Sequence, residues 1–167
     1  MMSQKKGIAK RVVGAIGVLL LVVHVVMGIA SCSSIECPVQ NKVELVCQLA
    51  DTLHDTLSVT SQRRNGTDTL LLNRGVNLTS MKLPLSYQNP VDTLVLKTVR
   101  MAVTDTVWVE KEDIPHFESV DCGLSYFHKI KSVRSTHLGI DTVIINKVLV
   151  DYDPSTAHLQ FHFKARP

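Results

Sequence analysis

A two-residue hydrophobic period dominates the chain from Val43 onward, and it restricts the fold more than any other feature. Apolar and polar residues alternate in Val43–Leu49 and again in Leu159–Phe163, as expected for half-buried strands. No helical period is maintained over about ten residues. Turn-forming residues separate the alternating segments, and Asn65-Gly66 between two of them predicts a hairpin.

Together these segments predict an all-β domain, an antiparallel β-sandwich of Ig-like or related type with about eight or nine short strands. A sandwich is favoured over a barrel because the alternating runs are short and uneven. Glu110–Asp113 is expected to form a turn, and Val143–Val150 is expected to form one long strand. The predicted core consists of the inward-facing residues Leu45, Cys47, Leu57, Val59, Leu70, Leu72, Leu94, Leu96, Val107, Val109, Ile145, Val148, Leu159, Phe161 and Phe163.

The first part of the chain has the layout of an export signal. Met1–Arg11 carries basic residues and no acid, and the unbroken apolar run Val12–Ser31 follows it. The run ends in Ile29-Ala30-Ser31-Cys32, which is similar to the bacterial lipobox. We therefore expect residues 1–31 to be a lipoprotein signal peptide and Cys32 to carry the lipid.

Cleavage before Cys32 leaves a lipid-anchored linker, residues 32–42, and a β-sandwich domain, residues 43–167. Each buried CH₂ of an acyl chain such as palmitate contributes about 0.8 kcal/mol, so several chains hold a protein firmly on a membrane. We expect attachment to the outer membrane, facing the periplasm, with the inner membrane as the alternative. A plain transmembrane anchor is the competing interpretation, because the run is close to the roughly 20 residues that a span needs.

The basic excess of the chain lies in the leader. Four of the 18 Lys and Arg residues and none of the 15 acids precede Cys32, which leaves 14 basic and 15 acidic residues after processing. The mature part contains neither a basic stripe nor an aromatic platform of the kind that nucleic-acid-binding proteins use. We therefore expect no nucleic-acid partner. The expected partners are the membrane, through the lipid anchor, and an unknown envelope protein or glycan.

The cysteines indicate one disulfide bond. Export places the domain in an oxidising compartment, where disulfides persist. Cys37 precedes a proline and Cys122 precedes a glycine, so both lie in turn-like settings, whereas Cys47 lies on the inward side of an alternating segment. We predict a Cys37–Cys122 bridge and a reduced, buried Cys47. Cysteine counting alone leaves three pairings open among the thiols other than Cys32.

One tripeptide, Asp-Thr followed by Leu or Val, recurs six times at irregular spacing. Asp commonly ends a turn, Thr favours strands, and the apolar residue enters the core, so the motif has a structural explanation. Its copies are Asp51-Thr52-Leu53, Asp55-Thr56-Leu57, Asp68-Thr69-Leu70, Asp92-Thr93-Leu94, Asp105-Thr106-Val107 and Asp141-Thr142-Val143.

Four segments carry a resemblance to a known family: Cys32–Pro38, Leu83–Tyr87, Pro115–Cys122 and Phe127-His128. With them, the chain resembles a family of uncharacterised outer-membrane lipoproteins from anaerobic Gram-negative gut bacteria, defined as a domain of unknown function. The resemblance implies an exported, lipid-anchored domain and supplies no activity.

The same resemblance implies a modification. Periplasmic proteins of such bacteria look to be O-glycosylated at Ser or Thr between Asp and a small apolar residue. Glycans at these positions would be bulky and solubilising. The candidate O-glycosylation residues are Thr52, Thr56, Thr69, Thr93, Thr106 and Thr142.

Candidate chemistry is sparse. His116 and Glu118 lie two residues apart, with Asp121, Cys122 and His128 beyond them, but a metal needs three or four converging ligands. His158 and His162 are about 13 Å apart if extended, and we expect both to be exposed polar positions. No phosphate-binding loop, HExxH or GxSxG motif is present. We therefore expect no catalytic residue, metal or cofactor.

The most favoured function is a lipid-anchored, periplasm-facing, non-catalytic binding or structural domain of the cell envelope. One alternative is an accessory subunit of an outer-membrane complex. Less favoured is a metal-dependent hydrolase built around His116–His128.

Overall fold

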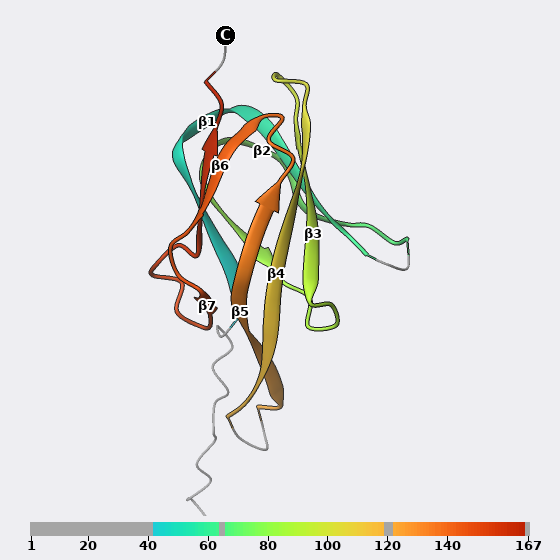
Figure 1. The fold of residues 1–167 in the computed structure, drawn as a ribbon, viewed down its shortest axis with the longest axis vertical. Coiled ribbons are helices and arrows are strands. Elements are labelled where there is room, and N and C mark those ends of the chain that lie inside the picture. Colours follow the sequence, from blue (N-terminus) through green and yellow to red (C-terminus); the bar gives the residue numbers. More distant parts are fainter. Residues whose placement is uncertain (1–41, 64–65, 119–121, 166–167) are drawn as a thin grey trace, which may run out of the picture. The chain divides into compact units, whose positions relative to one another are not determined.

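The computed structural model describes residues 42–63, 66–118 and 122–165, and all regular structure in them is β-strand (Figure 1). Eight strands hydrogen-bond into a single mixed sheet, so the all-β prediction is confirmed. No helix that could cross a membrane occurs among these residues. The strands are β1 (Glu44–Gln62), β2 (Thr69–Pro84), β3 (Val91–Thr98), β4 (Thr104–Phe117), β5 (Leu124–Ser135), β6 (Ile140–Ile145), β7 (Leu149–Val150) and β8 (Leu159–Phe163).

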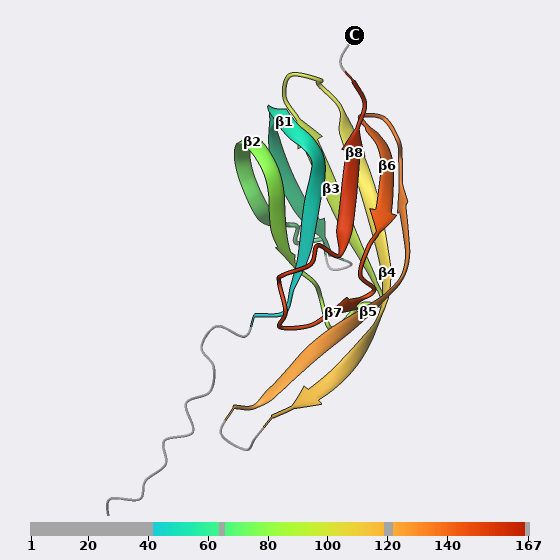
Figure 2. The same cartoon turned by 90° about the vertical axis from the view of Figure 1, so that its left-hand side faces the viewer.

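Strand β1 organises the sheet. One of its edges pairs with β2 in the predicted hairpin. Its other edge pairs first with β8, in parallel through Cys47–Leu49, and then with β3, antiparallel through Leu57–Gln62. Two arms, β8–β6 and β3–β4–β5–β7, therefore start from the same edge of β1 (Figures 1 and 2).

The arms enclose one hydrophobic core, to which all eight strands contribute side chains. The described strands form one sheet with a parallel pair, whereas the sequence predicts an antiparallel sandwich, so the sandwich and its Ig-like type stay a prediction. Most of the predicted core is buried. Leu70 and Val148 are exceptions with 53% and 49% of their surface exposed, because Leu70 lies on the outer strand β2, which pairs with β1 alone, and Val148 lies in a connection.

Strand β1 continues well beyond the alternating segment Val43–Leu49, and β2 is equally continuous. The polar stretch around Asp51–Asp55 interrupts the alternation, and bulges between Gln48 and Thr56 keep β1 paired through it. In β2, Arg74 and Asn77 adopt positive φ angles of 51°, which lets the strand follow the bulged partner.

Two further predictions about strands are wrong. Glu110–Asp113 is not a turn but part of β4, because Lys111 takes a buried position and a bulge after Glu110 preserves pairing with β5. Val143–Val150 is not one strand, because the backbone N–H groups of Asn146 and Lys147 donate to the His158 carbonyl and break the run.

Several predictions concern residues outside the described ranges. They are the signal peptide, the lipidation of Cys32 and the linker up to residue 41. The Cys37–Cys122 pairing stays a prediction for the same reason, since Cys37 is not described. Cys47 is free and buried, as predicted.

Candidate functional site

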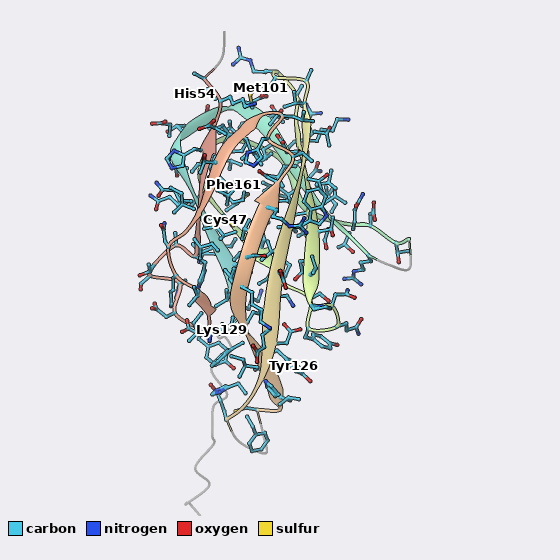
Figure 3. The ribbon with its side chains drawn as sticks, in the orientation of Figure 1. Cys47, His54, Met101, Tyr126, Lys129 and Phe161 are labelled. Atoms are coloured by element: carbon cyan, nitrogen blue, oxygen red, sulfur yellow. The ribbon has the colours of Figure 1, made fainter. Side chains whose placement is uncertain are left out.

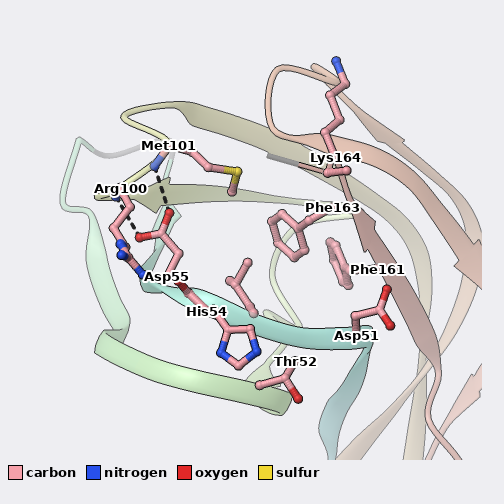
Figure 4. A pocket seen from close by; sticks show the side chains of 11 residues that line it. Asp51, Thr52, His54, Asp55, Arg100, Met101, Phe161, Phe163 and Lys164 are labelled. Atoms are coloured by element: carbon pink, nitrogen blue, oxygen red, sulfur yellow. Dashed lines mark hydrogen bonds between the residues drawn. The ribbon is translucent and has the colours of Figure 1, made fainter. Parts of the chain in front are cut away.

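A hollow opens where the two arms of the sheet separate on β1 (Figure 4). Pairing with β8 ends at Leu49 and pairing with β3 begins at Leu57, so residues 50–56 of β1 have no strand on that edge. The hollow encloses about 250 Å³. It lies toward the end of the domain marked by His54 and Met101, away from Tyr126 (Figure 3).

The floor of the hollow is apolar. Phe161 is fully buried, Leu53 is nearly so, and Phe163 and Met101 are half-buried. The rings of Phe161 and Phe163 are nearly parallel, with centroids 6.4 Å apart. Because Phe161 also belongs to the main core, a group that entered the hollow would contact the core directly.

A buried carboxylate holds the turn that closes the hollow on the other side. Asp55 accepts backbone hydrogen bonds from Arg100 at 2.7 Å and from Met101 at 2.9 Å (Figure 4). Burial raises the pKa of Asp55, but the backbone hydrogen bonds outweigh burial and the pKa is lowered. The ionised carboxylate therefore keeps Met101 in place beside the floor.

The rim carries polar and charged groups. His54 is exposed, and its Nδ1 lies 3.2 Å from Asn77 Oδ1. Arg100 donates through Nη1 to the His54 carbonyl at 3.1 Å, and Lys164 donates through Nζ to the His137 carbonyl at 2.6 Å.

A second hollow of about 330 Å³ adjoins the first, sharing Met101 and Lys164 with it and adding Val103 and Leu138. Leu138 has 58% of its surface exposed, so this end of the domain presents apolar side chains beside cations and polar groups. Such a mixture suits the capture of an apolar group whose polar neighbours contact the rim.

His116 and His128, the histidines of the predicted metal or hydrolase alternative, lie on opposite faces of the β4–β5 hairpin. In the strand register, Asp113 lies opposite His128 and His116 lies opposite Ser125. Successive side chains of a strand point to opposite faces, so His116, three residues after Asp113, lies on the other face from His128. His116 stacks on Phe127 with ring centroids 4.2 Å apart, and its Nε2 is 3.8 Å from Glu118. Asp121 lies outside the described residues, and no metal-binding group of His, Cys, Asp or Glu occurs among the rest.

His128 instead joins a buried charge network around Lys111. The Lys111 side chain is fully buried, and its Nζ donates to Asp113 Oδ1 at 2.6 Å, to the Asn89 carbonyl at 2.9 Å and to the Ser86 carbonyl. His128 Nδ1 lies 2.6 Å from the same Asp113 oxygen.

Two pKa shifts in this network have burial as their largest cause. Burial raises the pKa of Asp92, whose Oδ2 lies 3.5 Å from Lys111 Nζ. Burial also lowers the pKa of His128, although Asp113 opposes that shift. We assign a neutral imidazole that donates its Nδ1 proton to Asp113.

The prediction that His158 is exposed is wrong. His158 is fully buried, its Nδ1 accepts the Val46 backbone N–H at 2.9 Å, and its Nε2 has no partner. Burial, with a smaller contribution from the charge of Lys147, lowers its pKa. His162 is half-buried, and its Nε2 is also buried without a partner. Both histidines are structural positions that strand spacing alone could not identify.

Three copies of the Asp-Thr motif act as clamps on loops. Asp55 holds the turn at Arg100–Met101, and Asp92 accepts the Ser86 N–H. Asp105, 2% exposed, accepts the N–H groups of residues 138, 139 and 140. The structural interpretation of the motif is supported for these copies. Asp51, Asp68 and Asp141 are exposed.

The candidate glycosylation threonines remain predictions. Thr142 is exposed on β6, whereas the other candidates are half-buried. The half-buried set consists of Thr52, Thr56, Thr69, Thr93 and Thr106.

Apart from Thr52 and His128, the residues that form the hollow and the charge network were not predicted as functional. A signal for Lys111 existed, because it continues the inward positions of Val107 and Val109, where a lysine is unusual. Met101 and Phe163 carried no comparable signal, since their proximity depends on the two arms meeting at β1.

Comparisons with known proteins place the chain in a family. A search of curated proteins and a search of solved structures gave no match. A family model described as "Family of unknown function (DUF6452)" matches residues 56–163. Because this match covers more than half of the sequence, the chain belongs to the DUF6452 family of unknown function.

Proposed function

We propose that this protein is a non-catalytic binding domain of the bacterial cell envelope, anchored by lipid on Cys32. The arrangement of Met1–Arg11, the apolar run and the lipobox-like end supports export and anchoring. The proposed location is the outer membrane, facing the periplasm, with the inner membrane as the alternative. No cofactor takes part in this function.

The hollow between the arms is the observation that carries the binding role. Its apolar floor reaches the core at Phe161, and Asp55 holds its wall in place with backbone hydrogen bonds. Residue 44, where β1 begins, lies toward the Tyr126 end, so a tethered domain presents the hollow at the end away from its tether (Figures 1 and 3). The proposed occupant is an apolar group of an envelope protein or glycan.

We interpret the sheet as a sandwich-like fold in which the two arms form facing layers. The common origin of the arms on one edge of β1 and their single shared core support this interpretation. It explains why the hollow opens at the point where the layers part.

Metabolic labelling tests the anchor. An alkyne analogue of palmitate should enter the protein in its native host, and Cys32→Ala should abolish the label and release the protein from membranes. Cys47→Ala is the matched control, since Cys47 is buried in the core. Equal labelling of both variants would contradict lipidation at Cys32.

Site-specific photo-crosslinking tests the binding role. A photo-crosslinking amino acid at His54, on the rim, should capture an envelope protein or glycan in intact cells. The same amino acid at Lys129, exposed on β5 at the far end, should not (Figure 3). Met101→Trp places a larger side chain in the hollow and should reduce capture from His54. Identical products from both positions, or no effect of Met101→Trp, would count against the hollow as the binding site.

A further inference from the structure

A groove at the opposite end of the domain has the properties of a docking site for the chain's own N-terminal linker. It encloses about 490 Å³ and is lined by Val43, Leu85, Tyr87, Leu124, Ser125, Tyr126 and His128. Tyr87 and Leu124 have 58% and 56% of their surface exposed. Apolar side chains gathered at this level of exposure are commonly covered by a partner.

The groove is preformed by aromatic stacking and by the buried lysine. The rings of Tyr87 and Tyr126 are nearly parallel at 9°, with centroids 5.0 Å apart. Lys111 Nζ binds the carbonyls of Ser86 and Asn89, on either side of Tyr87 in the chain. The ammonium group therefore holds the loop that presents Tyr87.

The pairing of β1 with β2 ends beside this groove. Glu44 pairs with Pro84 and Leu45 pairs with Leu83, so one step back on β1 corresponds to one step forward on β2. If the chain before β1 kept this register, Asn41 would fall opposite Tyr87. Val43, the residue directly before β1, lines the groove.

The composition of the linker matches an aromatic groove. Residues 37–41 read Cys-Pro-Val-Gln-Asn, and Pro38 restricts the residue before it to an extended conformation. Extended segments that contain proline dock in grooves lined by aromatic rings, because little conformational entropy is lost on binding. We propose that residues 37–41 lie in this groove, with Pro38 and Val39 against Tyr87, Leu124 and Tyr126.

The predicted disulfide bond is compatible with this placement. Five residues lie between Cys37 and Val43, so the six steps span at most about 20 Å. Cys122 is two residues from Leu124, which lines the groove. Bond formation removes two protons and two electrons from the two thiols, and a thiol–disulfide oxidoreductase of an oxidising compartment would accept the electrons. Docking would set the direction in which the tether leaves the domain, independently of the hollow near His54.

Intramolecular photo-crosslinking in the full-length lipoprotein tests the proposal. A photo-crosslinking amino acid at Val39 should form a cross-link within the same chain to the peptide containing Tyr87 or to the one containing Leu124–Tyr126. Tyr126→Ala should lower its yield about fivefold, as expected for one aromatic contact. Lys129→Ala is the control, because that exposed side chain on β5 does not line the groove.

Two results would overturn the proposal. One is a cross-link from Val39 that maps outside the groove, or that is insensitive to Tyr126→Ala. The other is complete loss of the groove cross-link in Cys37→Ser, because the bridge alone would then hold the segment. Persistence of the cross-link in Cys37→Ser supports docking by the groove itself. Neither outcome depends on whether the hollow near His54 binds a partner.

Discussion

The imidazole Nδ1 of His158 accepts a hydrogen bond from the backbone N–H of Val46 at 2.9 Å. The same two residues are also joined by the His158 N–H, which donates to the Val46 carbonyl at 2.8 Å. This double contact lies beside the parallel pairing of β8 with β1. Since Nδ1 accepts, the proton of the neutral ring is on Nε2, and protonation of Nδ1 would break the contact.

Replacement of His158 by glutamine should destabilise the protein by about 2–4 kcal/mol, because a buried backbone N–H loses its acceptor in a packed site. Chemical denaturation followed by far-UV circular dichroism measures the change. His54→Gln is the control, since His54 is exposed, and it should cost less than about 0.5 kcal/mol. Equal effects of the two substitutions would contradict the structural role of His158.

Acid should weaken the native fold through the same residue. The folded-state pKa of His158 is lowered from 6.5, so its contribution to stability is complete above pH 6.5. The contribution is lost as pH falls from there through the folded-state pKa. Stability between pH 7 and pH 5 should therefore fall less in His158→Gln than in the wild type, measured by denaturation at each pH. The pKa of His128 is also lowered, but His128 is present in both proteins, so its contribution to the pH dependence of stability cancels in the difference.

Lys111→Met should destabilise the protein by about 3–5 kcal/mol, because it leaves the buried Asp92 and the partly buried Asp113 without their cation. Lys131→Met is a matched control on the neighbouring strand. Its pairing with Glu112 at 3.4 Å is half-exposed, so the loss should be below about 0.5 kcal/mol. Denaturant unfolding measures the free energy of unfolding of both variants. If Lys111→Met lost as little stability as Lys131→Met, the charge network would be dispensable for the fold.

Residue alternation was sufficient to identify most strands and most of the core. It depends only on side chains pointing to opposite faces, which local sequence records. It failed around Asp51–Asp55 and at Glu110–Asp113, where polar residues continue a strand. In both places a bulge and a buried charged group replace the missing apolar side chain, and that compensation involves residues distant in sequence, such as Arg100 and Asn89.

The candidate site could not be predicted in the same way. The hollow exists because β8 and β3 share one edge of β1, and strand order is not encoded in alternation. The Asp-Thr repeat was visible in sequence, but its copies differ in role. Asp105 is buried and binds a loop, whereas Asp141, in an identical Asp-Thr-Val tripeptide, is exposed.

This difference between Asp105 and Asp141 predicts opposite outcomes for one substitution. Asp105→Ala removes the acceptor of three backbone N–H groups and of the Thr136 hydroxyl, and should cost about 2–4 kcal/mol. Asp141→Ala should cost less than about 0.5 kcal/mol. Thermal unfolding of both variants compares them directly. Comparable losses would mean that the motif acts through Thr or the apolar residue rather than through the carboxylate.

Cys47 should not react with a maleimide in the native protein. Burial raises the pKa of its thiol well above the ordinary value, so the reactive thiolate is essentially absent and the sulfur is inaccessible. Labelling should become complete in denaturant, as measured by intact mass. A Cys47→Ala variant identifies the labelled position. Rapid labelling under native conditions would show that β1 opens locally near its pairing with β8.

Thr142 should carry a glycan before any other candidate threonine does, if the native host modifies the Asp-Thr motif. A transferase needs an accessible hydroxyl, and Thr142 is the exposed candidate, on β6, whereas Thr56 is half-buried on β1, where it pairs with Val76 of β2. Intact mass of the protein purified from its host measures the modification. Thr142→Ala should lower the mass by one glycan, and Thr56→Ala should leave the glycan content unchanged. A wild-type mass without sugar, or a larger loss in Thr56→Ala than in Thr142→Ala, would rule out an exposure-controlled modification and leave the loop clamps as the physical basis of the repeat.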